Sequence, residues 1–207
     1  RESQVIVRDD FWTSTSNKQL NFVQHIKTIL KINGRAAVVV PDNVLFEGGA
    51  GETVRRKLLH ECDVHTLLRL PTGIFYAQGV KTNVLFFTRG RTEKGNTKAV
   101  WVYDMRTNMP SFGKRTPLTH EHFAPFVQAY QASPRVDEGE TGRWRCFTRE
   151  QIRARGDNLD LTWLRDESAT HADGLPEPEE IAGEIVAHLE TAMEEMRALL
   201  EMLGGGE

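Results

Sequence analysis

The fold of this chain is decided by residues 64–90, which read VHTLLRLPTGIFYAQGVKTNVLFFTRG. The stretches Val64 to Leu70 and Asn83 to Thr88 are apolar and bounded by Pro or Gly, which predicts two strands. The connection between them is about a dozen residues long and has no helical periodicity, whereas a parallel crossover is usually built on a helix. We therefore predict an antiparallel hairpin whose loop carries two aromatic residues, Phe75 and Tyr76.

The residues before this hairpin alternate between helix and strand patterns. A helix is expected over residues 17–31, behind a Ser16–Gln19 capping box, with Gly34 as its left-handed stop. Residues 36–40, AAVVV, form a continuous apolar run, which is typical of a strand buried on both faces of a parallel sheet. After a loop, a second helix is expected over residues 52–62.

The second helix and the strand pattern at residues 99–103 complete the predicted fold. Helical spacing turns Leu58 and its apolar neighbours inward and Arg55, Arg56 and Lys57 outward. A strand, a crossover helix and a further strand form the unit of a doubly wound sheet. The predicted fold class is therefore α/β.

The order of elements loosens after residue 105. A short helix is expected over residues 121–131 behind Thr119, and SPRVDEGETG at 133–142 predicts a flexible connection. A long helix is predicted over residues 179–203, because apolar residues recur there at spacings of three and four. Its Met-rich stripe favours a helical partner over an intramolecular core contact. The stripe consists of Ile181, Ile185, Leu189, Met193, Met196, Leu200 and Leu203.

Composition bounds the classes of protein that remain. With 39% hydrophobic and 27% charged residues among 207, the chain reads as globular. No apolar run approaches a membrane span and no signal-peptide pattern opens the chain, so a cytoplasmic location is expected. Cys62 and Cys146 show no metal-site spacing and are expected to be reduced thiols. The chain begins at Arg1, so we expect it to be part of something longer.

Charge is distributed unevenly along the chain. Residues 167–207 hold 11 acidic residues and one basic residue, a net charge of −10, whereas the remainder holds 25 basic and 18 acidic residues, a net charge of +7. A basic body and an acidic segment suggest a polyanionic partner for the first and a protein partner for the second. Ordinary salt-bridged surface charge is the alternative.

Three groups of residues are candidates for a site. Asp42 and Asn43 follow a strand at the sheet edge where α/β enzymes place working groups, although a simple turn explains them equally well. The loop GGAG, with Gly48, Gly49 and Gly51, lacks the residues of a nucleotide cradle and is interpreted as a loop able to touch a DNA phosphate. His120-Glu-His122 lacks further ligands, so no metal is expected.

Four stretches carry a family resemblance. They read GRAAVVVPDNVLFEGG, LLRLPTGIFYAQGVKTNVLFFTRG, VWVYDMRTNMPSFGKRTPLT and LPEPEEIAGEI. The chain resembles the modification (methyltransferase) subunit of type I restriction-modification systems, densely over residues 15–119 and again in RWRCFTREQI, DNLDLTWLRD and the C-terminal helix. The resemblance implies an adenine-N6 DNA methyltransferase that uses S-adenosylmethionine.

The family's cofactor loop and catalytic Asn-Pro-Pro-Phe tetrapeptide are not found in this sequence. The resemblance therefore implies the carboxyl-side half of a Rossmann-like methyltransferase sheet, ending in an antiparallel hairpin and followed by a mainly helical C-terminal arm. On that basis residues 1–118 belong to the catalytic domain, 119–176 form a connector of helix and loop, and 177–207 form a helix for subunit assembly. No catalytic, cofactor-binding or metal-binding residue is assigned, and no activity is expected from this chain alone.

The resemblance also gives the hairpin loop a role. A methyltransferase of this kind extrudes the target adenine, and aromatic side chains replace the lost stacking. Phe75 is expected to stack on the flipped base, with Tyr76 as its substitute, unless Phe75 merely packs the loop onto the sheet. Lys81 and Thr82 are expected near the DNA backbone. The implied partners are DNA, the specificity subunit, a second modification subunit and the restriction subunit.

Overall fold

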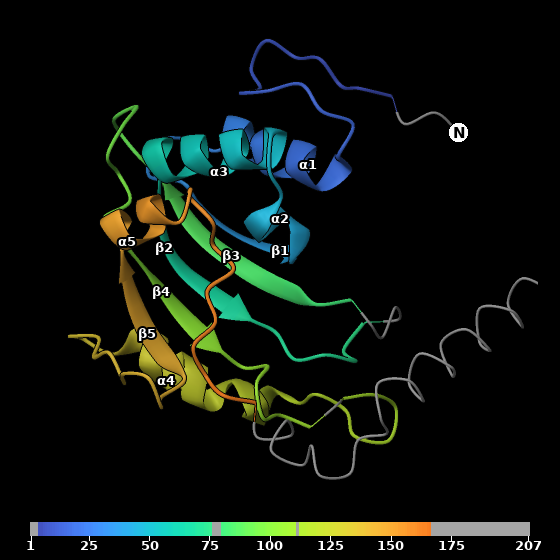
Figure 1. Ribbon diagram of the computed structural model, residues 1–207, viewed down its shortest axis with the longest axis vertical. Coiled ribbons are helices and arrows are strands. Elements are labelled where there is room, and N and C mark those ends of the chain that lie inside the picture. The colour runs from blue at the N-terminus through green and yellow to red at the C-terminus, as the bar shows by residue number, and fades with distance from the viewer. Residues whose placement is uncertain (1–3, 76–79, 111, 167–207) are drawn as a thin grey trace, which may run out of the picture. The chain divides into compact units, whose positions relative to one another are not determined.

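The computed structural model describes residues 4–75, 80–110 and 112–166, and its core is a five-stranded mixed sheet (Figure 1). The strand order is β1-β3-β2-β4-β5. The β2–β4 pair is parallel, and the β1–β3, β2–β3 and β4–β5 pairs are antiparallel. The strands are β1 (Arg35–Pro41), β2 (Cys62–Arg69), β3 (Thr82–Arg89), β4 (Ala99–Asp104) and β5 (Trp144–Thr148).

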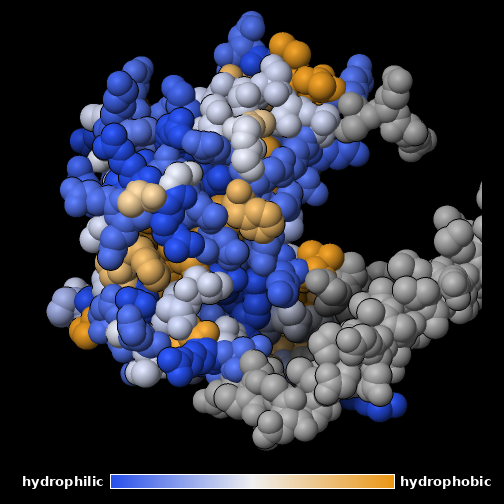
Figure 2. Space-filling view, viewed as in Figure 1, coloured by the Kyte–Doolittle hydropathy of each residue, from blue (hydrophilic) through white to orange (hydrophobic). Residues whose placement is uncertain are grey.

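Helices cover both faces of this sheet (Figure 1). The helices are α1 (Lys18–Ile29), α2 (Asn43–Phe46), α3 (Ala50–Glu61), α4 (Ala124–Gln131) and α5 (Arg149–Ala154), with a 3-10 turn at His120–Phe123. Because neighbouring strand residues point to opposite faces, Leu67 packs with α1, α3 and α5, whereas Leu68 packs with α4. Figure 2 accordingly shows mostly hydrophilic residues on the face in view, with apolar groups scattered among them.

The predicted hairpin is confirmed. Strands β2 and β3 pair antiparallel from Cys62 opposite Arg89 to Arg69 opposite Asn83, with one irregularity after Val64. The predicted α/β class is likewise confirmed for the described residues. The predicted arm with its long helix at 179–203 lies outside those residues.

The prediction of β1 as a strand buried on both faces is wrong. β1 is an edge strand, and Val39 in its middle is 52% exposed. The reason is that β3 lies between β1 and β2 in the sheet. Strand β2, which follows the crossover helix α3, therefore pairs with β3 and β4 and not with β1. Strand order depends on pairing between distant segments, which an apolar run cannot specify.

Several local predictions need correction. The cap of α1 is Asn17 and not Ser16, because the Asn17 side chain accepts hydrogen bonds from the amides of Gln19 and Leu20. The left-handed residue after this helix is Asn33, with φ of 63°, and not Gly34. A Cβ on Gly34 would nevertheless lie 2.7 Å from the Lys31 carbonyl oxygen, so the glycine permits a close approach.

The segment between β1 and β2 also differs from the prediction. The expected loop at 42–51 contains α2, and α3 already begins at Ala50. Arg55 points inward and not outward, since it is only 3% exposed. Its guanidinium donates to the carbonyls of Val44, Glu47 and Asp157, which ties α2, α3 and the turn after α5 together.

Strand β5 and helix α5 were not predicted. Trp144 of β5 is buried, and the strand joins the same sheet as β4 within one unit that runs to Arg165. A local signal exists, because Thr148 and Gln151 form a capping box at the start of α5. Both cysteines are free, as predicted, and burial raises the pKa of the Cys62 thiol to about 11.

Candidate functional site

The hairpin loop is closed at its base by backbone and arginine hydrogen bonds. The Leu70 amide donates to the Thr82 carbonyl at 3.0 Å, where the loop leaves β2 and returns to β3. Arg106 contacts both ends, since its Nε donates to the Leu70 carbonyl at 3.0 Å and its Nη2 to the Thr82 carbonyl at 2.8 Å. One guanidinium from beyond β4 therefore fixes both ends of the loop.

Asp42 holds this guanidinium in place from the end of β1. Arg106 Nη1 and Nη2 donate to the two Asp42 carboxylate oxygens at 2.8 and 2.9 Å, a bidentate pair. Asn83 Nδ2 donates to Asp42 Oδ1 at 2.7 Å. Burial alone raises the pKa of Asp42, but the hydrogen bonds from Arg106 and Asn83 and the Arg106 charge outweigh it and hold that pKa below its ordinary value.

Arg106 is directed toward Asp42 by a turn at the end of β4. The Asp104 carboxylate accepts from the amides of Arg106 and Thr107 and from the Thr107 hydroxyl, at 2.7 to 2.8 Å. Such a side-chain turn is a common use of Asp after a strand. The sequence analysis did not identify Arg106, although the pattern Asp-Met-Arg-Thr at 104–107 contains this turn signal.

A second contact fixes the loop beyond its base. Gly73 has φ of +81°, and a Cβ added there would lie 2.0 Å from the Phe112 carbonyl oxygen. The Phe112 amide donates to the Thr72 carbonyl at 3.2 Å, and the buried Phe112 ring meets His122 edge-on at 5.0 Å. Only glycine combines this backbone angle with this approach, so residues 72–75 are held against residue 112.

Phe75 is placed outward by this arrangement. Its side chain is 42% exposed, whereas neighbouring Ile74 packs against the apolar cluster around Leu70. Both roles, stacking on a flipped base and packing of the loop onto the sheet, stay predictions. Tyr76 lies outside the described residues.

The predicted DNA-proximal residues do not form one cluster. Lys81 is exposed, and its carbonyl accepts from the Asp42 amide at 3.1 Å, which places it beside the loop base. Thr82 is buried, and its hydroxyl has no hydrogen-bond partner among the described residues. Contact of either residue with DNA stays a prediction. The exposed Lys81 is accessible to a DNA phosphate, whereas the buried Thr82 is not.

The glycine loop lies before helix α3. Gly48 and Gly49 are exposed, and Gly49 has φ of +58°. Gly51 is buried, and a Cβ there would lie 3.0 Å from Glu47. Glu47 in turn accepts a hydrogen bond from Asn43 Nδ2 at 3.1 Å. The side chain of the predicted site residue Asn43 therefore points to Glu47, before the glycine loop, and not to Asp42. A contact of these glycines with DNA phosphate stays a prediction.

The described residues do not fit S-adenosylmethionine at this sheet edge. Two acidic residues, Asp42 and Asp104, lie there. Arg106 and Asn83 occupy both oxygens of Asp42, and Asp104 accepts from Arg106 and Thr107. Arg106 in turn donates to two loop carbonyls as well. These side chains are therefore arranged to hold the loop, and we derive no step of methyl transfer from them.

Neither a metal site nor a membrane-spanning helix is found in the described residues. Among them no group of three or more His, Cys, Asp or Glu side chains is placed to hold a metal ion. His122 instead accepts a hydrogen bond at Nδ1 from the Thr119 amide at 3.0 Å, which stabilises the 3-10 turn. Within the same residues, no helix combines the length and the apolar character of a membrane span.

Comparison with known proteins gives the family. The model of the N-6 DNA Methylase family matches residues 2–172, and the chain belongs to this family. It is 52% identical to the EcoKI methylase subunit of Escherichia coli (strain K12) and 51% identical to the StySJI methylase subunit of Salmonella typhimurium (strain LT2), both type I restriction enzymes. The resemblance to type I modification subunits is thereby confirmed.

The match extends to solved structures. The crystal structure of the EcoKI M protein superposes with a TM-score of 0.73 at 49% identity, covering 96% of this chain and 47% of that chain. A chain from a type I restriction-modification system, solved in a study of complex assembly, gives 0.65 at 27% identity, covering 99% and 44%. The chain also covers 43% of the EcoKI and StySJI methylase subunits, so it spans less than half the length of these relatives.

Proposed function

We propose that this chain provides the base-binding and DNA-facing side of a cytoplasmic type I adenine-N6 DNA methyltransferase. In this proposal S-adenosylmethionine and the catalytic Asn-Pro-Pro-Phe tetrapeptide are held by other parts of the subunit, since the sequence here contains no Pro-Pro and the described sheet edge does not fit the cofactor. The chain alone is then inactive.

The exposed Phe75 on a fixed loop carries the proposal. A ring that replaces lost base stacking must be open to the base and held in position, because disorder in the unbound loop would cost conformational entropy on binding. Phe75 is 42% exposed, Arg106 fixes the two ends of the loop, and Gly73 lies against Phe112 two residues before Phe75. The exposure of Lys81 beside the same loop base supports its proposed contact with a backbone phosphate.

The test is Phe75→Ala in the intact modification subunit assembled with its specificity subunit. Stacking on an aromatic ring contributes about 1 to 3 kcal/mol per base. We therefore expect methylation to fall by about 5- to 150-fold. The fluorescence rise of 2-aminopurine at the target position, which reports base extrusion, should also fall.

A matched control comes from the same loop. Val80 is also apolar and 42% exposed, so Val80→Ala removes a comparable side chain at the other end of the loop. Methylation and 2-aminopurine fluorescence should stay close to those of the native subunit. Equal turnover and extrusion in the Phe75→Ala and native enzymes would refute the stacking role.

The terminal apolar stripe supports a second part of the proposal, docking on the specificity subunit. Its residues lie outside the described part of the chain, so the support is the sequence spacing alone. Replacing Ile185, Leu189 and Met196 by Gln should abolish co-purification with the specificity subunit. Replacing the polar neighbours Glu184, Glu190 and Glu195 by Gln should not, and retention of the complex by the first variant would contradict this docking mode.

A further inference from the structure

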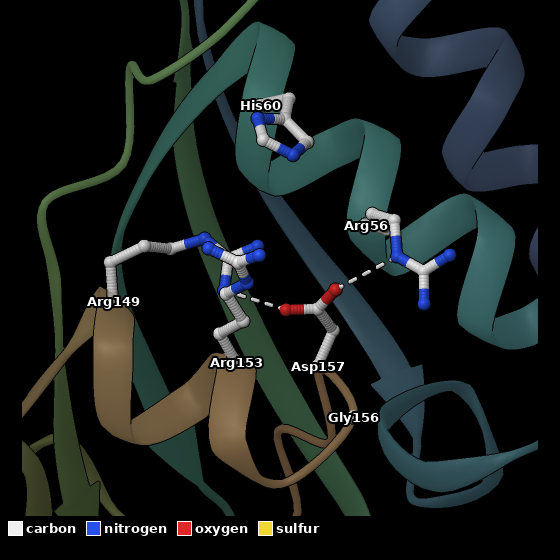
Figure 3. A pocket seen from close by; sticks show the side chains of 6 residues that line it. All are labelled: Arg56, His60, Arg149, Arg153, Gly156 and Asp157. Carbon is white, nitrogen blue, oxygen red and sulfur yellow. Dashed lines mark hydrogen bonds and ion pairs between the residues drawn. The ribbon is translucent and has the colours of Figure 1, made fainter.

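A cationic pocket lies at the opposite end of the sheet from the hairpin loop. The loop base meets the carboxyl ends of β1 and β4, at Asp42 and Arg106. The pocket lies where β2 and β4 begin, since α3 ends directly before β2 and Thr148, which precedes α5, pairs with Ala99 at the start of β4. Its volume is about 490 Å³ and it is lined by Arg56, His60, Arg149, Arg153, Gly156 and Asp157 (Figure 3).

Positive charge exceeds negative charge in this pocket. Asp157 is buried and pairs with Arg149 at 2.6 Å and with Arg56 at 3.2 Å. Arg56 also pairs with Glu52 one helical turn earlier. Among the described residues, no hydrogen bond or ion pair holds the Arg153 guanidinium, which Figure 3 shows on the same side as that of Arg149. Three guanidinium groups and one carboxylate thus line the pocket, and Glu52 is a partner of Arg56 outside that lining.

Among the described residues, the pocket also contains a buried polar atom without a protein partner. His60 Nδ1 is buried and has no hydrogen-bond partner in the described part of the chain, whereas Arg149 Nη1 is paired with Asp157 at 2.6 Å. Buried polar atoms are normally satisfied, so His60 Nδ1, beside the Arg153 guanidinium, indicates a group that is supplied from outside the protein. Burial and the charge of Arg149 lower the pKa of His60, which an added anion would oppose.

We propose that this pocket binds a small phosphate-bearing ligand, held by Arg149 and Arg153 with His60 as a further partner. Guanidinium groups match the geometry of phosphate oxygens and donate to them in pairs. A concave site of this size suits a small molecule with one or more phosphate groups. A duplex backbone would instead require a row of basic residues along a surface.

The test uses the full 207-residue chain and pyrophosphate as the probe. Calorimetric titration at constant ionic strength should show one pyrophosphate bound per chain. Arg153→Gln removes a guanidinium that no protein group uses, so the fold should be retained while the dissociation constant rises about tenfold or more. Titrations with orthophosphate and with adenosine triphosphate then show whether one phosphate group or a chain of them is preferred.

The matched control is Arg155→Gln. Arg155 lies two residues away and carries the same charge, but it does not line the pocket and donates to the Asp160 carbonyl at 3.2 Å. This variant should bind pyrophosphate as the native chain does. In the native chain the His60 ring resonances should shift on titration. No binding by the native chain, or equal weakening by the two variants, would overturn the proposal, since either result means that no site or only general electrostatics is present.

Discussion

The two ends of the sheet use arginine in opposite ways. At the loop end, Arg106 donates to Asp42, Leu70 and Thr82, and Asp42 receives further support from Asn83. At the pocket end, Arg149 pairs with Asp157 at 2.6 Å, but the Arg153 guanidinium has no partner among the described residues. A guanidinium whose donors are used stabilises one backbone geometry, whereas an unpaired one retains the capacity to bind.

This difference separates positioning residues from binding residues. Charge alone does not distinguish them, because both ends contain largely buried arginine–aspartate pairs. Positioning and binding residues are distinguished by the number of guanidinium donors that protein groups already use. Arg106 is therefore a positioning residue for the loop, and replacing it should disturb the fold before it disturbs any ligand.

The largest effect is expected for Arg106→Ala. The change leaves the Asp42 carboxylate, which is mostly buried, without its partner, and it frees both ends of the hairpin loop. Breaking a buried pair from one side typically costs about 3 to 5 kcal/mol. The free energy of unfolding in urea should fall by about that amount, and hydrogen exchange should accelerate at the loop base.

Arg91→Ala is the matched control for this measurement. Arg91 is exposed, and its one side-chain hydrogen bond, to Asn33 at 3.4 Å, is long. Its removal should change the free energy of unfolding by no more than about 0.5 kcal/mol. If the two variants proved equally stable, the loop network would contribute nothing and the contrast between the two ends would fail.

A smaller effect is expected from acid. The folded-state pKa of Asp42 is depressed, so its contribution to stability is present above the unfolded pKa and is lost as pH falls through the folded pKa. Asp42→Asn should therefore lower the urea midpoint at about pH 7 and flatten its decline below about pH 4.

The exposed Asp9 gives the comparison for this pH series. Asp9→Asn should leave the pH dependence of the urea midpoint parallel to that of the native chain. Parallel curves for Asp42→Asn as well would mean that Asp42 is not held in its charged form by Arg106. That result would contradict the depressed pKa rather than the fold.

The elements were predictable where the pattern is local. The hairpin of β2 and β3 follows from two apolar runs and a short non-helical loop, and it is confirmed. The edge position of β1 was not predictable, because it depends on β3 inserting between β1 and β2. The outward orientation predicted for Arg55 was wrong for a similar reason, since its guanidinium donates to carbonyls of helix α2 and its cap, at Val44 and Glu47, and of the distant Asp157.

The candidate site was predictable only in part. Phe75 could be singled out because an aromatic residue in a loop before a strand is conspicuous in the sequence, and the structure leaves it exposed. Arg106 and the arginine pocket could not be identified from the sequence, because the residues that meet there come from positions up to about a hundred residues apart. Arg56 and Asp157 are an example. Spacing along the chain reports such clusters only when one helix or strand carries all members.

The smallest effect is expected for Arg153→Gln, and it sharpens the contrast with Arg106. Because the Arg153 guanidinium uses none of its donors on the described protein groups, its replacement should change the free energy of unfolding by no more than about 0.5 kcal/mol. Relief of repulsion from Arg149 could even stabilise the chain slightly, and added salt should reduce that gain. Urea unfolding at low and at moderate ionic strength measures both. A loss as large as that of Arg106→Ala would show that Arg153 is part of the fold, and the donors at the pocket end would then be structural like those at the loop end.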